Sequence, residues 1–195
     1  MRKLEIRSQI AVDREARRMG VWDDCGPSSA AAAASWVLGK TITAREGIAA
    51  KERATGKADV QGVSDNGSSL PQLLKTVKIL GADGRYPASW EDAIRAGKRG
   101  AALIVNVSNG LSPFYDGVKM SRWHRRLVKK NPGANGYGHM VAFAYDPEIG
   151  WQFADPTMSG SGTEIYAVPV TEAQVRSIAS SKGDAPKGRT LIVRK

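Results

Sequence analysis

The sequence predicts a single domain of the α+β class, with helices in its first half packed on an antiparallel sheet from its second half. The chain has 195 residues, which is the usual length of one domain and long enough to bury a sizeable core. Segments with helix start and stop signals dominate the first hundred residues or so. Short apolar segments separated by turns dominate the rest, and their spacing favours antiparallel strands.

The expected helices are marked by their first and last residues. An alanine-rich helix ends at Leu38 before Gly39, and Pro27 lies near its start. Thr43, with Glu46 three residues later, has the spacing of a capping box and begins a second helix. Three further helices are expected over residues 69–80, 89–97 and 171–178.

The expected strands are short apolar segments bounded by glycine, proline or aspartate. The turn Asp146–Gly150 separates two of them and predicts a hairpin. Leu4 and Ile6 indicate a short strand near the start of the chain. The main strands are expected over residues 101–107, 139–145, 151–155, 164–170 and 191–193.

Cys25 is the only cysteine, and it lies in Asp24-Cys25-Gly26-Pro27, directly before the alanine-rich helix. One cysteine excludes an internal disulfide framework and cysteine-rich zinc sites. At or just before a helix N-terminus, the unpaired N–H groups and the helix dipole favour the thiolate form of the side chain. Several hydrolases hold their nucleophile in this way, so Cys25 is the first candidate catalytic residue.

The chain has two histidines, His124 and His139, and one of them can pair with a carboxylate. If Tyr145 faces Trp151 across the hairpin, Asp155 lies on the same face of the sheet as His139. A carboxylate there would hold the imidazole in the tautomer that a cysteine nucleophile needs. By contrast, His124 lies among cations, which suits surface contact better than catalysis.

These residues resemble a known family, the papain-like cysteine peptidases, and most closely the group related to bacteriocin-processing peptidase domains. The matching pieces are Asp24-Cys25-Gly26-Pro27 before a helix, Gly138-His139-Met140-Val141, and Asp155-Pro156 at a strand end. The order of the helices and strands between them also matches, over roughly residues 20–170. The resemblance implies a papain-like fold in which Cys25 is the nucleophile, His139 the general base and Asp155 the orienting carboxylate.

Two features depart from that family. A glutamine usually lies about six residues before the cysteine and helps to form the oxyanion hole; here that position is Met19, and the nearest upstream glutamine is Gln9. The backbone N–H of Cys25 or the indole of Trp22 could donate instead. The second departure is the long basic insertion over residues 108–138, which suggests a substrate lid or docking surface. Residues 1–20 form an N-terminal extension.

The net charge of +10, from 29 Lys and Arg against 19 Asp and Glu, attracts nucleic acid, anionic cell-wall polymers or acidic proteins, unless it serves only solubility. No recognised nucleic-acid motif accompanies this positive charge.

No cofactor is implied, and the few His and Cys residues lack the spacing of a metal site. Met1–Arg7 lacks the apolar region of a signal peptide, and no stretch is long enough to span a membrane. We therefore expect cytoplasmic synthesis, with release by lysis or inside a virus particle.

The sequence thus indicates a thiol-dependent peptide hydrolase with a Cys25, His139 and Asp155 triad. Its substrate is expected to be a protein precursor or the peptide crosslinks of a bacterial cell wall, as for a phage-associated wall hydrolase. The alternative is a catalytically inactive papain-like module that has a structural or binding role, for example in a virion tail. Met19 in place of glutamine favours this alternative, whereas the presence of all three triad residues opposes it.

Overall fold

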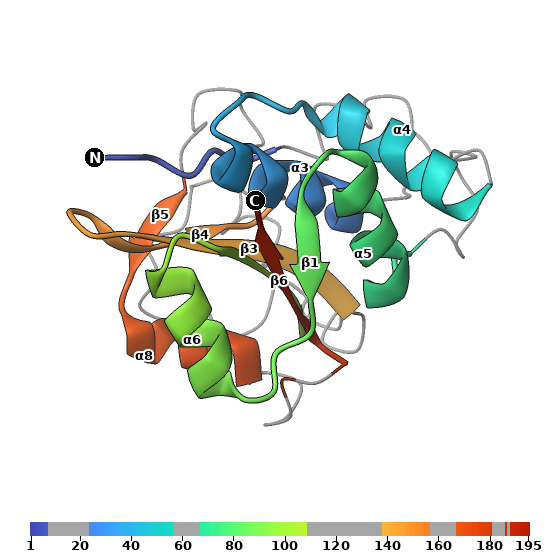
Figure 1. Cartoon of the computed structure of the whole chain (residues 1–195). Coiled ribbons are helices and arrows are strands. Elements are labelled where there is room, and N and C mark those ends of the chain that lie inside the picture. The colour runs from blue at the N-terminus through green and yellow to red at the C-terminus, as the bar shows by residue number, and fades with distance from the viewer. Residues whose placement is uncertain (8–23, 57–66, 109–137, 157–166, 181–185, 187) are drawn as a thin grey trace, which may run out of the picture.

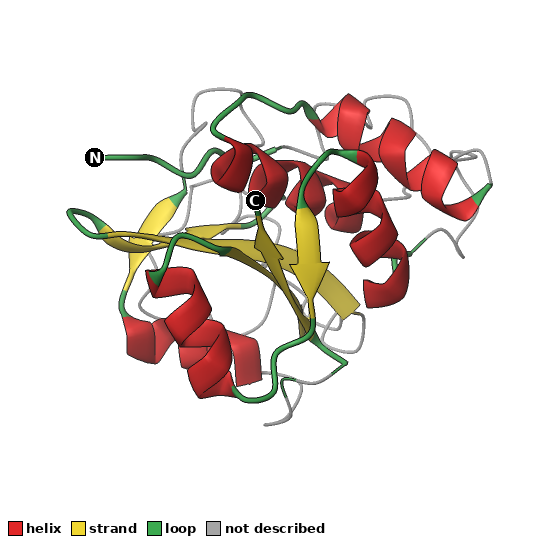
Figure 2. Cartoon of the chain, viewed as in Figure 1, coloured by secondary structure: helices red, strands yellow, loops and turns green. Residues whose placement is uncertain are grey.

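The computed structural model describes residues 1–7, 24–56, 67–108, 138–156, 167–180, 186 and 188–195. Within these ranges, helices pack on both sides of a six-stranded sheet (Figures 1 and 2), in which the strand order is β1-β6-β2-β3-β4-β5. All neighbouring strands are antiparallel. The expected α+β class is therefore confirmed.

The helices lie where the sequence predicts them, and three begin with complete capping boxes. In these, the side chains of Thr43, Ser69 and Thr171 each accept a hydrogen bond from the backbone N–H three residues later. The side-chain oxygen of that later residue in turn accepts a hydrogen bond from the backbone N–H of the capping residue. Figure 1 shows α3, α4 and α5 on one side of the sheet and α6 and α8 on the other. The bounds are α3 Cys25–Leu38, α4 Ala44–Thr55, α5 Leu70–Ile79, α6 Trp90–Lys98 and α8 Glu172–Ala179.

Two strands differ from the expectation: one forms that the sequence did not predict, and one that it predicted is absent from the described residues. β1 has only three residues and forms by pairing with β6 at the edge of the sheet. The short strand expected at Leu4 and Ile6 is wrong: only a single bridge at Glu5 is present there, with the N–H of Ala167 donating to the Leu4 carbonyl at 2.9 Å. The bounds are β1 Asp83–Arg85, β2 Ala102–Ser108, β3 Gly138–Asp146, β4 Gly150–Ala154, β5 Val168–Val170 and β6 Thr190–Arg194.

The described residues share one hydrophobic core, which joins α3 to the central strands. Phe143 of β3 and Phe153 of β4 are fully buried, and their ring centroids lie 5.0 Å apart. Leu4 and Ile6 are buried in the same cluster, so the first residues of the expected N-terminal extension belong to the core. Most of that extension and of the expected insertion over residues 108–138 lies outside the described residues.

The contact between α3 and α4 depends on a glycine. A Cβ atom added to Gly47 would lie 2.4 Å from the carbonyl oxygen of Pro27, in the first turn of α3, and 3.1 Å from the Ala31 side chain. The neighbour at 2.4 Å is backbone, which cannot move without shifting the helix that begins with Cys25. The close approach of these two helices therefore fixes where the start of α3 lies.

We expect Gly47→Ala to lower the free energy of unfolding by about 1–3 kcal/mol, because the added methyl group overpacks the contact between the helices. In an exposed helix the same substitution would stabilise the protein by about 1 kcal/mol, so the sign is diagnostic. Urea denaturation measures the difference. Gly67→Ala is the control for adding a methyl group without a steric contact, since Gly67 lies outside the helices and a Cβ there has no neighbour within 4 Å. Equal effects of the two substitutions would contradict the proposed role of Gly47.

Candidate active site

Cys25 is the first residue of α3, as the sequence predicts. Its side chain is largely buried, with 9% of the residue exposed. The preceding residue, Asp24, makes no side-chain capping bond to the helix. Within the part of the chain that the structure describes, the backbone N–H of Cys25 has no acceptor. As far as the described residues show, an N–H group is thus available beside the thiol at the positive end of the helix dipole.

His139 and Asp155 are brought together by the hairpin of β3 and β4. Tyr145 pairs with Trp151 across the turn, so the predicted register is confirmed. The imidazole Nε2 of His139 lies 2.8 Å from Oδ1 of Asp155, within hydrogen-bond distance. Asp155 is fully buried and His139 is 7% exposed, so water competes little for this hydrogen bond.

The thiol lies close to the same imidazole: a hydrogen bond with His139 and the charge of that ring lower the pKa of Cys25. Because Nε2 is engaged by Asp155, Nδ1 is the ring nitrogen left for that bond. The three predicted site residues thus form one continuous chain of contacts, with the histidine in the middle. This is the arrangement of a nucleophile, a base and a group that orients the base.

Burial alone would raise the pKa of the Cys25 thiol, but the hydrogen bond and charge of His139, with the N–H of Met140, outweigh it and lower that pKa. Burial would likewise lower the pKa of His139, yet the charge and hydrogen bond of Asp155, together with Cys25, raise it well above its ordinary value. Both shifts favour a thiolate beside an imidazolium at neutral pH. A thiolate in this pair is the reactive form of the nucleophile.

Two contacts that the sequence analysis did not find hold β3 against the start of α3. The backbone N–H of Met140 donates to the Cys25 sulfur at 3.5 Å. The hydroxyl of Ser29 donates to the Met140 carbonyl at 3.0 Å, and both groups are buried. Ser29 follows Cys25 by four residues and therefore lies on the same face of α3. That spacing places Ser29 on the side of the helix that carries Cys25, but it does not identify Met140 as its partner.

Several residues singled out in the sequence lie outside the described residues: Gln9, Met19, Trp22 and His124. Among the residues that are described, no group of three or more His, Cys, Asp or Glu side chains could hold a metal ion. No helix in the described ranges has both the length and the apolar character needed to cross a membrane.

Comparison with known proteins gives a distant structural likeness. No protein-family model matches the sequence, and no curated protein does either. A crystal structure from Bacillus anthracis, which carries the provisional description of a C39-like peptidase, resembles the fold with a TM-score of 0.48. The two chains are 16% identical, and the match covers 88% of each.

Proposed function

We propose that this protein is a cysteine peptidase or amidase that hydrolyses peptide bonds, with a site of the papain-like type. The observation that carries the proposal is the position of His139, which contacts both the Cys25 thiol and the Asp155 carboxylate. A histidine with a purely structural role needs only one hydrogen-bond partner, and a buried cysteine with such a role needs none. A histidine placed beside both a thiol and a carboxylate therefore favours a catalytic role. The opposed pKa shifts of Cys25 and His139 add support, because they would activate the thiol.

In the proposed reaction the Cys25 thiolate attacks the carbonyl carbon of the peptide bond. The oxygen of the tetrahedral intermediate accepts a hydrogen bond from the N–H of Cys25, which has no acceptor among the described residues. The His139 imidazolium gives its proton to the leaving amine, which produces a thioester on Cys25. His139 then takes a proton from water, whose oxygen attacks the thioester and releases the acid and the Cys25 thiolate, so that the starting ion pair is restored. Asp155 keeps the ring oriented throughout.

The proposed site has one identified oxyanion donor, where a papain-like enzyme usually has two. Losing one such donor typically costs on the order of a hundred- to a thousandfold in rate. Because Met19 replaces the usual glutamine, we expect either a slow enzyme or a donor from another residue, such as Trp22. The absence of that glutamine also supports the second candidate, a catalytically inactive module with a structural or binding role.

We further propose that the substrate is the peptide part of a bacterial cell wall, in preference to a precursor protein. The support is the net charge of +10, which would concentrate the protein on anionic wall polymers. A phage-associated wall hydrolase, made in the cytoplasm and carried in the virion or released by lysis, fits this charge. A virion tail component would be the corresponding setting for the inactive module.

The proposed function is tested by incubating purified wall peptides, and separately a mixed library of unrelated peptides, with the native protein and with Cys25→Ala. We expect new amino termini with the native protein and none with Cys25→Ala, because no other side chain replaces the thiolate. Lys75→Gln is the control, since it removes one exposed charge from α5. Cleavage confined to the library would reject the wall substrate and retain the peptidase. No cleavage of either, with intact binding to walls, would favour the inactive module.

A further inference from the structure

The main-chain groups of Met140 bond to α3 and not to a neighbouring strand. Asn106 lies opposite Met140 in β2, but its N–H donates to the Arg189 carbonyl at 2.7 Å. The two opposed residues therefore do not exchange the hydrogen bonds of an antiparallel pair. On the other side of β3, strand β4 ends at Ala154, opposite Ala142, and does not extend to Met140. The N–H and the carbonyl of Met140 are thus left for other partners.

The first turns of α3 supply both partners. The Cys25 sulfur accepts a hydrogen bond from the Met140 N–H at 3.5 Å, and the Ser29 hydroxyl donates to the Met140 carbonyl at 3.0 Å. Residues four apart in a helix lie on the same face, so the two side chains together hold one residue of β3. Ser29 is 1% exposed and Met140 is 3% exposed, so water competes little for either bond. Because His139 directly precedes Met140, the same contacts help to set where the imidazole lies relative to the thiol.

The N–H of Met140 is one of the groups that favour the thiolate. Burial raises the pKa of the Cys25 thiol, and the hydrogen bond and charge of His139 oppose burial, with the Met140 N–H adding to their effect. A hydrogen bond to an ionised group is stronger than one to a neutral group, so this N–H stabilises the thiolate more than the thiol. The strength of that bond depends on how closely the N–H is held. The Ser29 bond to the carbonyl of the same residue holds it.

We propose that Ser29 is a positioning residue of the candidate active site, which holds the backbone N–H of Met140 against the Cys25 sulfur. This inference rests on the proposed function, because it assigns Ser29 to the same site. Ser29 acts on the sulfur through Met140, so it is not itself a catalytic residue. Its contribution is to keep the thiolate supplied with a donor that does not depend on His139.

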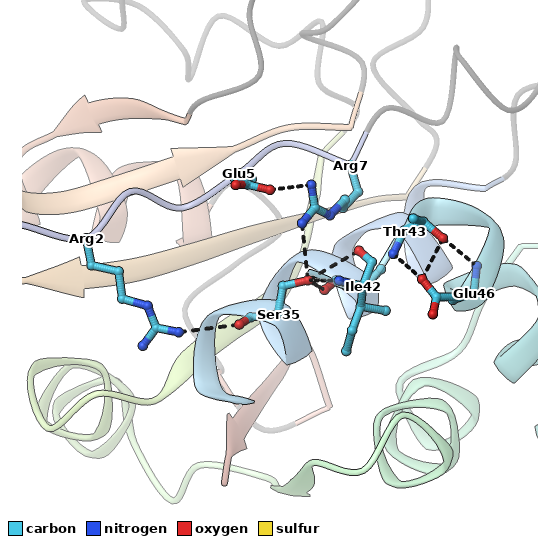
Figure 3. A network of polar contacts seen from close by, with 8 residues as sticks. Arg2, Glu5, Arg7, Ser35, Ile42, Thr43 and Glu46 are labelled. Carbon is cyan, nitrogen blue, oxygen red and sulfur yellow. Dashed lines mark hydrogen bonds and ion pairs between the residues drawn. The ribbon is translucent and has the colours of Figure 1, made fainter. Parts of the chain in front are cut away.

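The far end of α3 is anchored independently of Ser29. Figure 3 shows Ser35, in the last turn of the helix, whose side-chain oxygen accepts a hydrogen bond from the Ile42 N–H at 2.9 Å. The Ser35 carbonyl accepts another from the Arg2 guanidinium at 3.4 Å. Loss of the Ser29 hydroxyl should therefore leave the helix in place and loosen only the contact at its first turns.

Ser28 offers a matched control at the neighbouring position of the helix. Its side chain is fully buried, but its hydroxyl has no hydrogen-bond partner among the described residues. Ser28 and Ser29 thus share residue type, burial and helix turn, and they differ in the contact to Met140. We expect Ser28→Ala to leave the thiol pKa at its native value. The charged groups that act on the thiol, His139 and Asp155, are the same in both variants.

The test is the rate of alkylation of Cys25 by iodoacetamide as a function of pH in the native protein, Ser29→Ala and Ser28→Ala, with folding checked by circular dichroism. We expect Ser29→Ala to raise the thiol pKa by roughly 0.5–1 pH unit, because the bond from the Met140 N–H to the thiolate weakens. At a pH below both pKa values, alkylation of Ser29→Ala should be about three- to tenfold slower than that of the native protein. A purely structural role would lower the melting temperature without moving the thiol pKa.

Two results would overturn the role of Ser29 alone: a low native thiol pKa that Ser29→Ala leaves unchanged, or an equal shift in Ser28→Ala. An ordinary thiol pKa in the native protein would overturn the proposed active site as well. If Ser29→Ala does not fold, the amide proton signal of Met140 in nuclear magnetic resonance spectra of the native protein decides. That signal should shift as Cys25 ionises, and a signal that does not respond to the ionisation would overturn the proposal.

Discussion

Replacing Asp155 with alanine is expected to lower the rate of peptide hydrolysis by about a thousandfold or more. Asp155 is fully buried, and its Oδ1 lies 2.8 Å from Nε2 of His139. Without the carboxylate the ring loses the group that orients it and the charge that raises its pKa. The thiol then loses its imidazolium partner. The measurement is kcat/KM on a peptide cleaved by the native protein, with the melting temperature recorded for each variant.

Asp155→Asn separates the two roles of this carboxylate. The asparagine oxygen can still accept a hydrogen bond from Nε2, so the ring keeps its orientation, but the negative charge is gone. We therefore expect an activity between those of the native protein and Asp155→Ala, with the pKa of His139 lowered toward its ordinary value. An Asp155→Ala variant that folds and keeps more than about a tenth of the native rate would contradict a catalytic role for this residue.

Phe143→Ala is expected to lower the free energy of unfolding by about 3–5 kcal/mol. Phe143 is fully buried in β3 and packs on Phe153 of β4, so its loss leaves a cavity between the two strands that bring His139 to Asp155. That cost is a large fraction of the stability of a typical domain. Urea denaturation measures it.

The control for Phe143→Ala is Phe143→Leu, which keeps most of the volume and should cost about 1.5 kcal/mol or less. Because the core around β3 is continuous with α3, we expect the alanine variant also to loosen the contact between Met140 and Cys25. A cost below about 1 kcal/mol for Phe143→Ala would mean that the hairpin is not anchored through this side chain.

Local patterns in the sequence predicted the features that depend on neighbouring residues. The capping boxes at Thr43 and Thr171 involve residues three apart, so each is readable without knowledge of the fold. The approach of His139 to Asp155 follows from the hairpin register, because a short turn fixes which residues lie opposite each other. These patterns sufficed to place the main helices, the central hairpin and the candidate histidine and aspartate pair.

Features that depend on distant residues were not predictable in this way. β1 has three residues, including Gly84, and becomes a strand only because the C-terminal strand β6 lies beside it. Ser29 and Met140 are 111 residues apart, and no local signal names one as the partner of the other. A pocket beside Trp36 likewise forms only because residues of the N-terminal segment lie against the end of α3. Tertiary packing decides each of these contacts.

The most direct test of the proposed site is the rate of alkylation of Cys25 by iodoacetamide as a function of pH, in the native protein and in His139→Ala. The single cysteine makes the signal unambiguous. We predict that the native thiol titrates well below the free value of about 8.5. In His139→Ala, once circular dichroism shows it to be folded, burial should raise the pKa above that value. An ordinary thiol pKa in the native protein, or one that is the same in both proteins, would contradict an assembled pair of Cys25 and His139.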